Sequence, residues 1–244
     1  MSELLFVSCL SNWQVAQDCL LASPCLQPGG HPLVMRWNAR SAAEALNSVL
    51  DSQPPQRWAV WLHQDVRLPA GWDQQFISGV AAAEAQLGPL AVVGAYGLRG
   101  VGAQAQRAGH VLDRGQLLHE PAPLPCLVDS LDELLFAVRT NCGLRLDPAL
   151  GFDFYATDLV LQAQAMGLQC AVVDAYCEHW SGTPSQGEVS DHLVQRISTS
   201  AQAFEQKWIA RLPITTPCFD IAQPGDTLAF LEAARRLPPP AQGH

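Results

Sequence analysis

The stretch that most constrains the fold runs over residues 58–72, WAVWLHQDVRLPAGW. Its first five residues are all apolar, and a continuous run of this length is typical of a strand buried on both faces of a sheet. The chain then presents an imidazole, an amide and a carboxylate, those of His63, Gln64 and Asp65. In open α/β sheets, ligands bind beyond the carboxyl ends of the strands. The stretch therefore predicts a buried strand that ends at a polar site, although these residue types also simply begin loops or cap helices.

Strand-like and helix-like segments alternate through the first half of the chain. Apolar runs of strand length occur at residues 4–10, 33–36, 58–62 and 90–93. Helical periodicity between them predicts helices at about residues 12–22, 42–50 and 72–87. This alternation predicts an α/β fold whose central sheet is mostly parallel and flanked by helices. Glycines at 94, 97, 100 and 102 then indicate a mobile loop, and residues 110–118 indicate a hairpin, which gives the fold a small antiparallel portion.

Composition excludes several classes of function. The 244 residues carry a formal net charge of −9, without a basic run interleaved with aromatics, so a nucleic acid polymer is not an expected partner. The eight cysteines form no CxxC pair, which argues against a zinc site and favours reduced, buried thiols. The N-terminus lacks a basic segment of the signal-peptide type, and no apolar run reaches the length of a membrane span. We therefore expect a cytoplasmic protein.

The second half places several carboxylates near predicted helix starts. Ser130 and Glu133 have capping-box spacing, which predicts a helix through about residue 139 with Asp132 in its first turn. Thr157 is the predicted N-cap of a later helix, and Asp158 would lie in the first turn of that helix. His179 follows a strand predicted at residues 170–173, and a lone histidine is usually structural.

Three segments resemble a bacterial family of glycosyltransferase-like proteins, the HQD-motif relatives of family 2 glycosyltransferases. WLHQDVRLPAGW resembles the HQD segment of that family, and VDSLDELLFAVR and GFDFYATDLVLQAQAMG resemble later segments in the same order. The resemblance covers about residues 4–210 and implies a GT-A-like fold, that of nucleotide-diphospho-sugar transferases, over residues 1–212. Residues 213–244 would be a C-terminal extension with one short helix, and an oligomer contact is one role open to it. The implied activity is metal-dependent transfer of a sugar from a nucleotide-diphosphate sugar to a hydroxyl of a glycan or other acceptor, by inverting direct displacement.

The resemblance also assigns roles to individual residues. A divalent ion, manganese or magnesium, would be bound by Asp65 and His179. Asp158 would be the general base, with Asp153 as its competitor, and Asp132 would lie near the donor sugar. The nucleotide sugar would contact residues in the first third of the chain, namely Ser8, Asn38, Asn47, His63, Gln64 and Asp65. His179 would also draw a mobile segment at residues 179–190 over the site. We therefore expect amide exchange across residues 181–190 to slow when metal and nucleotide bind together.

Two alternatives remain open at the level of sequence. The segment at residues 35–38 lacks the Asp that many relatives place near the nucleotide base, which leaves the nucleotide unassigned. A catalytically inactive nucleotide-sugar-binding or scaffold protein with the same fold is the first alternative, because the HQD segment offers one carboxylate for metal. A nucleotidyltransferase is the second, but residues 8–14, SCLSNWQ, lack the glycines and lysine of a phosphate-binding loop.

Overall fold

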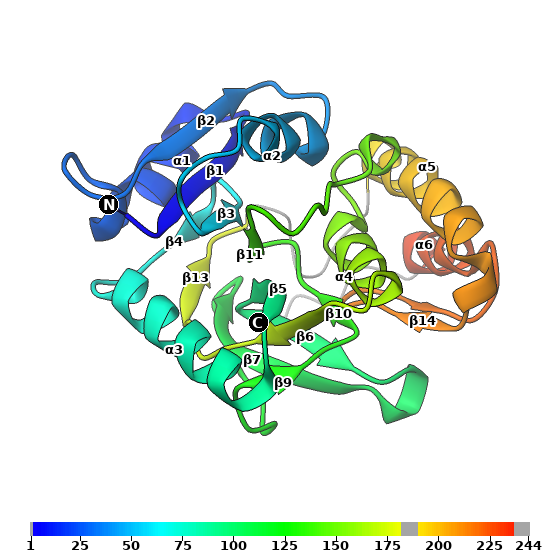
Figure 1. Cartoon of the computed structure of the whole chain (residues 1–244). Helices are drawn as coiled ribbons and strands as arrows, with labels where there is room; N and C mark the ends of the chain where they lie inside the picture. The colour runs from blue at the N-terminus through cyan, green and yellow to red at the C-terminus, as the bar shows by residue number, and fades with distance from the viewer. Residues whose placement is uncertain (1, 182–189, 237–244) are drawn as a thin grey trace, which may run out of the picture.

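A mixed seven-stranded sheet is the centre of the computed structural model, which describes residues 2–181 and 190–236 (Figure 1). Its strands follow one another in the order β2 (Leu33–Trp37), β1 (Leu4–Leu10), β3 (Trp58–Leu62), β11 (Leu135–Arg139), β5 (Leu90–Gly94), β12 (Gln169–Val172) and β9 (Cys126–Leu127). The pairs β1–β2, β1–β3 and β5–β12 are parallel. Strand β11 runs antiparallel to both β3 and β5, and β9 runs antiparallel to β12. The fold is therefore α/β with a largely parallel sheet, as predicted.

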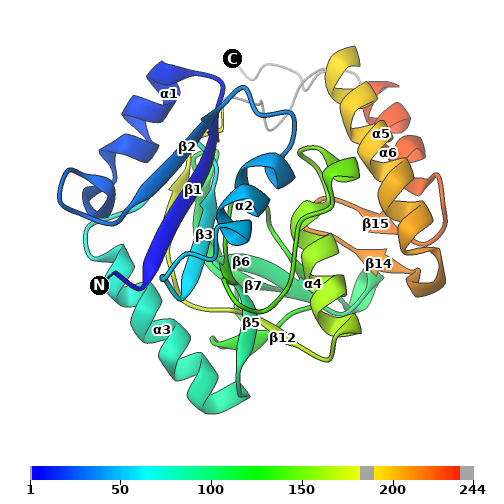
Figure 2. The ribbon, with the colours of Figure 1, turned by 45° about the horizontal axis from the view of Figure 1, so that its top comes forward.

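Helices cover both faces of this sheet because its strands are apolar on both sides. On one face lie α1 (Trp13–Asp18) and α3 (Trp72–Leu87), and on the other lie α2 (Ala42–Asp51) and α4 (Tyr155–Ala165) (Figure 2). Successive side chains of β1 alternate between the two cores, with Leu4 and Phe6 in the first and Leu5 and Val7 in the second. The five residues of β3 are all buried, as the apolar run at 58–62 predicted.

A second sheet packs beside the first and supplies one wall of the site. Its strands are β10 (Ser130–Leu131), β6 (Tyr96–Arg99), β7 (Gln106–Asp113), β13 (Cys177–His179) and β4 (Val66–Arg67), with β8 (Gln116–His119) paired to β7. The β7–β8 pair is the hairpin predicted at 110–118, and Arg114 and Gly115 form its turn with positive φ. The glycines that indicated a mobile loop instead flank or belong to β6. Gly97 lies where a Cβ would approach the carbonyl oxygen of Ser130 to 2.5 Å, so it is required for close strand packing.

The helix predicted from Ser130 to Arg139 is wrong, because this segment forms strands β10 and β11. The S-x-x-E spacing fits a capping box, yet the run that follows, LLFAVR, has the strand-length apolar character that a central position between two buried strands favours. The same motif is correct at Ser41, whose side chain accepts a hydrogen bond from the backbone N–H of Glu44 at the start of α2. Thr157 is not the N-cap of α4. That position is taken by Phe154, in the left-handed region with φ 64°.

The C-terminal part forms a third, smaller core. Helices α5 (Asp191–Lys207) and α6 (Asp226–Arg236) lie side by side, and β14 (Ile214–Thr215) pairs with β15 (Asp220–Ile221) next to them (Figure 1). Phe204 of α5 and Phe154 stack with ring centroids 5.1 Å apart, so this part is joined to the start of α4. The predicted short helix is thus present, and a small two-stranded sheet precedes it.

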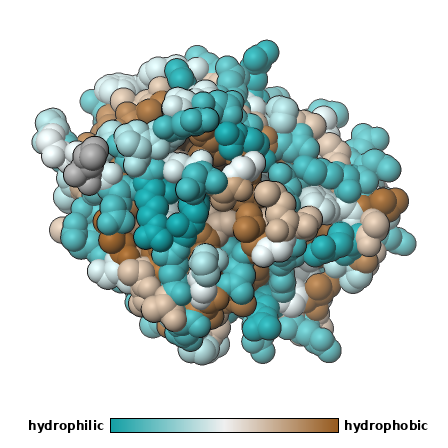
Figure 3. All heavy atoms as spheres, viewed as in Figure 1, coloured by the Kyte–Doolittle hydropathy of each residue, from teal (hydrophilic) through white to brown (hydrophobic). Residues whose placement is uncertain are grey.

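Short 3₁₀ turns complete the described chain, at Leu20–Ala22, Pro24–Leu26, Gly102–Gln104, Pro148–Leu150 and Ile209–Arg211. Hydrophilic residues cover much of the face shown in Figure 3, interrupted by smaller hydrophobic areas. None of the helices within residues 2–181 and 190–236 has the length and hydropathy that crossing a membrane requires. The eight cysteines, all within the described ranges, are free thiols.

Candidate metal centre and its cavity

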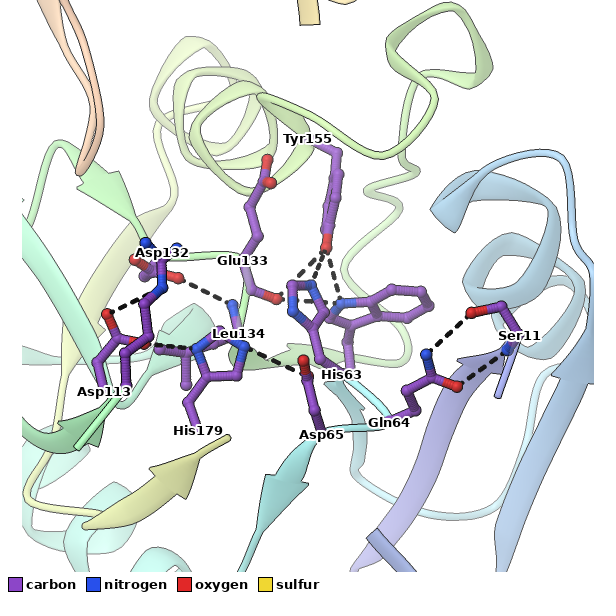
Figure 4. Close-up of polar contacts among 12 residues, drawn as sticks. Ser11, His63, Gln64, Asp65, Asp113, Asp132, Glu133, Leu134, Tyr155 and His179 are labelled. Carbon is purple, nitrogen blue, oxygen red and sulfur yellow. Dashed lines mark hydrogen bonds and ion pairs between the residues drawn. The ribbon is translucent and has the colours of Figure 1, made fainter. Parts of the chain in front are cut away.

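The turn after β3 carries three polar side chains in three different directions (Figure 4). His63 is held by the hydroxyl of Tyr155, which lies 2.8 Å from His63 Nε2. Gln64 accepts hydrogen bonds from the backbone N–H groups of Ser11 and Asn12 at 2.9 and 3.0 Å, so it fixes the end of β1 to the end of β3. The Asp65 side chain instead points toward His179 on β13. The backbone carbonyl of Asp65 also accepts a hydrogen bond from Trp180 N–H at 2.8 Å.

His179, at the end of β13, lies between two carboxylates. Its Nδ1 is 2.8 Å from Asp113 Oδ1, and its Nε2 is 3.3 Å from Asp65 Oδ1. Strand β13 pairs with both β7 and β4, which brings Asp113 and the segment after Asp65 to His179 from opposite sides. A carboxylate that orients one ring nitrogen while the other faces a second ligand is a common arrangement around metal-binding histidines.

His63, Asp65 and His179 together form a potential metal site. One ligand atom from each lies within 4.8 Å of the others, a spacing that a single ion bridges. Two imidazoles and one carboxylate are a donor set that suits borderline divalent ions such as manganese, iron or zinc, so the residues present fit a divalent metal. Asp65 and His179 are the two predicted metal ligands, and the structure brings them together. It adds His63, which we had expected at the nucleotide.

The two histidines have opposite electrostatic environments. Burial, together with the nearby His179, lowers the pKa of His63 to about 4. Burial alone would also lower the pKa of His179, but its hydrogen bonds with Asp113 and Asp65 outweigh burial and raise the pKa to about 9. Burial alone would raise the pKa of Asp65, yet its hydrogen bond and charge interaction with His179 keep it below the ordinary value. The group is thus a neutral imidazole beside an imidazolium held by two carboxylates.

A cavity of about 500 Å³ opens next to these residues. Its walls carry several acidic side chains besides Asp65 and Asp113, namely Asp132, Glu133 and Asp153, and three arginines, Arg107, Arg114 and Arg196. Arg196 binds Asp153 with both nitrogens of its fork, at 2.8 and 3.1 Å. Burial raises the pKa of Asp132 and, more strongly, that of Glu133. Residues 216–219 of the C-terminal part close one side of the cavity.

Asp158, the predicted general base, does not line this cavity. Its carboxylate is fully buried, where it pairs with Lys207 Nζ at 2.7 Å and accepts hydrogen bonds from Trp208 Nε1 at 2.8 Å and Gln162 Nε2 at 2.6 Å. A base must reach the proton of the acceptor hydroxyl, and an oxygen pair engaged in this way cannot. Asp158 does lie in the first turn of α4, as predicted, but the geometry assigns it to the junction of α4 and α5.

Three predicted nucleotide contacts also have other surroundings. Asn47 links α2 to the Leu146 backbone through both ends of its amide, at 2.8 and 2.9 Å. Ser8 is fully buried inside β1, and its hydroxyl has no partner among the described residues. Asn38 is exposed at the end of β2 with φ 47° and so stays open to a ligand. Residues 182–189, most of the segment predicted to close over the site, lie outside the described residues.

Sequence reasoning missed four side chains that shape the site: Asp113, Glu133, Tyr155 and Arg196. Asp113 was assigned to a hairpin turn, and Glu133 to a helix cap. Glu133 carried the one usable signal, because it adjoins Asp132 directly before a strand-length apolar run, a change between polar and apolar residues like the one after β3.

Comparison with known proteins gives weak likenesses. No family model matches the chain. A curated protein of Fuscovulum blasticum, described as "ATP synthase subunits region ORF 6", is 28% identical over an alignment of 164 residues. The match covers 62% of this chain and 61% of that protein. The chain thus matches about three fifths of the length of this relative.

Two solved structures are similar to this chain in backbone arrangement. The mannosyltransferase PcManGT from Pyrobaculum calidifontis, in complex with GDP-Man and Mn2+, has a TM-score of 0.48 and 13% identity, over 96% of this chain and 70% of that one. GalNAc-T7 with UDP, GalNAc and Mn2+ has a TM-score of 0.48 and 12% identity, over 95% of this chain and 54% of that one. Likenesses at this level assign no activity to this chain, so its function has to be inferred from the side chains of the site itself.

Proposed function

We propose that this protein is a metal-dependent glycosyltransferase of GT-A-like fold that moves a sugar from a nucleotide-diphosphate sugar to an acceptor hydroxyl. One observation carries the proposal: His63, Asp65 and His179 converge at the carboxyl end of the buried strand β3, next to a cavity of about 500 Å³. This is the edge of a parallel sheet at which α/β proteins bind ligands. A volume of this size suits a sugar and the diphosphate attached to it.

Different residues around the cavity would contact the metal, the diphosphate and the nucleotide. His63, Asp65 and His179 would hold the metal, manganese rather than magnesium because two of the three ligands are imidazoles. The metal would supply positive charge to the departing diphosphate. Arg107 and Arg114 line the same cavity and add fixed positive charge. Gln64 and Ser11 are hydrogen-bonded to each other and link the ends of β3 and β1, and Asn38 follows the end of the neighbouring strand β2. We place the nucleotide toward these residues.

Inverting displacement needs a carboxylate that contacts the acceptor. Of the three predicted candidates, Asp132 and Asp153 line the cavity and Asp158 does not. Asp153 is bound by Arg196 and accepts a hydrogen bond from Ser200, so it serves better to orient the cavity wall. We place the acceptor, a glycan or other hydroxyl compound, on the side formed by Asp132 and residues 216–219.

The direct test is a binding experiment. Thermal shift and calorimetry would follow the protein with UDP, GDP, UDP-glucose, UDP-N-acetylglucosamine and GDP-mannose, each with Mn2+, with Mg2+ and with EDTA. The expected result is stabilisation by one nucleotide only when metal is present, since ligand bound to the native state raises stability by mass action. Asp65→Asn should lose that stabilisation, and Asp174→Asn, a change outside the cavity, should keep it. A protein that binds neither metal nor any of these nucleotides would refute the proposal.

A catalytically inactive nucleotide-sugar-binding protein is the second candidate. It is favoured by a metal group with a single carboxylate and by the engagement of Asp158 with Lys207. The two candidates separate in one measurement: metal-dependent binding without any release of nucleoside diphosphate, with water or with a panel of sugar alcohols as acceptors, supports the inactive form. In either case the relation to HQD-motif bacterial enzymes, a cytoplasmic location and self-association are part of the proposal.

A further inference from the structure

Glu133 lines the cavity and carries a carboxyl oxygen without a hydrogen-bond partner among the described residues. It lies in the turn between β10 and β11, and its side chain extends toward the start of α4 (Figure 4). The backbone N–H groups of Tyr155 and Ala156 act on its carboxyl group from the first turn of that helix. Its Oε1 is buried and has no hydrogen-bond partner within residues 2–181 and 190–236. The carboxyl group is thus held near the helix start, while its Oε1 is left without a hydrogen-bond partner.

A purely structural cap would not leave that oxygen unused. Helix α6 shows the comparison, because Glu205 is also buried and also satisfies a helix start from a distant element. Its Oε2 accepts from Gly225 N–H at 2.6 Å, and its Oε1 accepts from Thr227 N–H at 3.3 Å. Both carboxyl oxygens of Glu205 accept hydrogen bonds, whereas Oε1 of Glu133 has no donor among the described residues. A buried polar atom without a partner in a native protein calls for an explanation, such as a catalytic role or a bound water or ion.

The other acidic side chains of the cavity are already engaged. Asp65 and Asp113 hold His179, Asp153 is bound by Arg196, and Asp132 accepts a hydrogen bond from Leu134 N–H at 3.0 Å. Burial, followed by the negative charges of Asp153 and Asp132, raises the pKa of Glu133. A carboxylate with a raised pKa is a stronger base than an exposed one.

We infer that Glu133 is the catalytic residue that binds the acceptor hydroxyl and takes its proton during transfer. This inference rests on the proposed function. The acceptor oxygen forms a bond to the anomeric carbon of the donor sugar, and the bond from that carbon to the diphosphate oxygen breaks. The bonding electron pair leaves with the nucleoside diphosphate, and the acceptor proton goes to the free oxygen of Glu133. With water as acceptor, the same step releases the free sugar.

The test measures donor binding and bond cleavage separately, using the nucleotide sugar of the panel above that stabilises the wild-type protein most. Calorimetry with Mn2+ gives its affinity, and single-turnover release of the nucleoside diphosphate gives the cleavage rate. Glu133→Gln should bind Mn2+ and donor within about twofold of wild type but cleave about 10²–10⁴-fold more slowly, the usual range for loss of a general base. Glu205→Gln is the matched control, since it also alters a buried capping carboxylate, and it should cleave at the wild-type rate per folded molecule.

A second variant tests whether the lost cleavage reflects a missing proton acceptor or a disturbed structure. Formate added to Glu133→Ala should restore part of the cleavage rate, because a small carboxylate fits the vacated space, and it should leave wild type and Glu205→Gln unchanged. A Glu133→Gln protein that binds and cleaves like wild type would overturn this inference and leave the proposed function standing. A wild-type protein that binds no donor with metal, or binds it without cleavage, would overturn this inference together with the catalytic form of the proposed function.

Discussion

Replacing Asp113 by asparagine should change how metal affinity depends on pH. Asp113 is the carboxylate that holds Nδ1 of His179 at 2.8 Å, while Nε2 faces Asp65. Burial disfavours the charged imidazole, but the Asp113 hydrogen bond is foremost among the interactions that raise the pKa of His179 to about 9. A metal must displace that proton in order to bind Nε2. Asp113 therefore orients the histidine for metal and at the same time strengthens the proton as a competitor.

The magnitudes of these two effects can be set against each other. With a pKa of about 9, proton competition at pH 7 weakens metal binding about 100-fold, and the penalty falls about tenfold for each unit of rising pH. In Asp113→Asn the pKa of His179 should fall toward its ordinary 6.5, which leaves less than about a twofold penalty at pH 7. Loss of an orienting carboxylate typically lowers metal affinity by 10–100-fold. At pH 7 the two changes nearly cancel, whereas near pH 8.5 the wild-type proton penalty is only about fourfold and the loss dominates.

Calorimetric titration with Mn2+ between pH 6 and 8.5 would measure this directly. Wild-type affinity should rise about tenfold per pH unit over the range, and the affinity of Asp113→Asn should be nearly flat above pH 7. Repeating the titration in buffers of different ionisation enthalpy counts the protons released, about one for wild type and near zero for the variant at pH 7.5. Glu178→Gln, on the same strand, is the control and should keep the wild-type slope. Parallel slopes for wild type and Asp113→Asn would refute the assignment of His179 as a ligand competing with a proton.

Three further outcomes follow from the described contacts. Asp65→Ala should stay folded by circular dichroism yet lose metal-dependent nucleotide binding, and unchanged affinity would remove Asp65 from the metal site. Without metal, stability to urea should peak near pH 6.5. Burial makes charging His63 costly as pH falls from 6.5 toward 4, whereas the stabilisation from charged His179 is complete below pH 6.5 and lost as pH rises through about 9. His63→Gln should flatten mainly the acid side of this profile and His179→Gln mainly the alkaline side. Asp158→Asn should lower the free energy of unfolding by about 1–3 kcal/mol, because a buried carboxylate holding Lys207 and Trp208 is lost, while cleavage per folded molecule stays near wild type; a large loss of cleavage without loss of stability would restore Asp158 as the base.

Much of the fold could be predicted from sequence because local pattern and global position agree in the first half. The apolar runs at 4–10 and 58–62 are long enough to be buried strands, and the S-x-x-E motif at Ser41 precedes a true helical periodicity. The error at 130–139 arose where two local signals disagreed. A capping-box spacing pointed to a helix, and the apolar run pointed to a strand that is central only because β3 and β5, distant in sequence, lie on both sides of it.

The site was predicted less completely because most of its contacts are long-range. His63 and Asp65 follow a strand and were visible as a change from apolar to polar residues. His179 meets Asp113 and Asp65 only because β13 pairs with β7 and β4, which no local pattern shows. Asp158 has the local setting expected of a base at a helix start, and its true partners, Lys207 and Trp208, come from the far end of α5.

The place of His179 on β13 also bears on how the chain unfolds. His63 and Asp65 belong to the first third of the sequence, and His179 is more than a hundred residues further on, across two sheets. An ion bound by all three would act as a removable cross-link that closes a very long loop, and such a link must break before the two sheets separate. Unfolding of the loaded protein should therefore slow markedly while refolding of the stripped chain keeps its rate, which makes the metal a kinetic clamp on the native state.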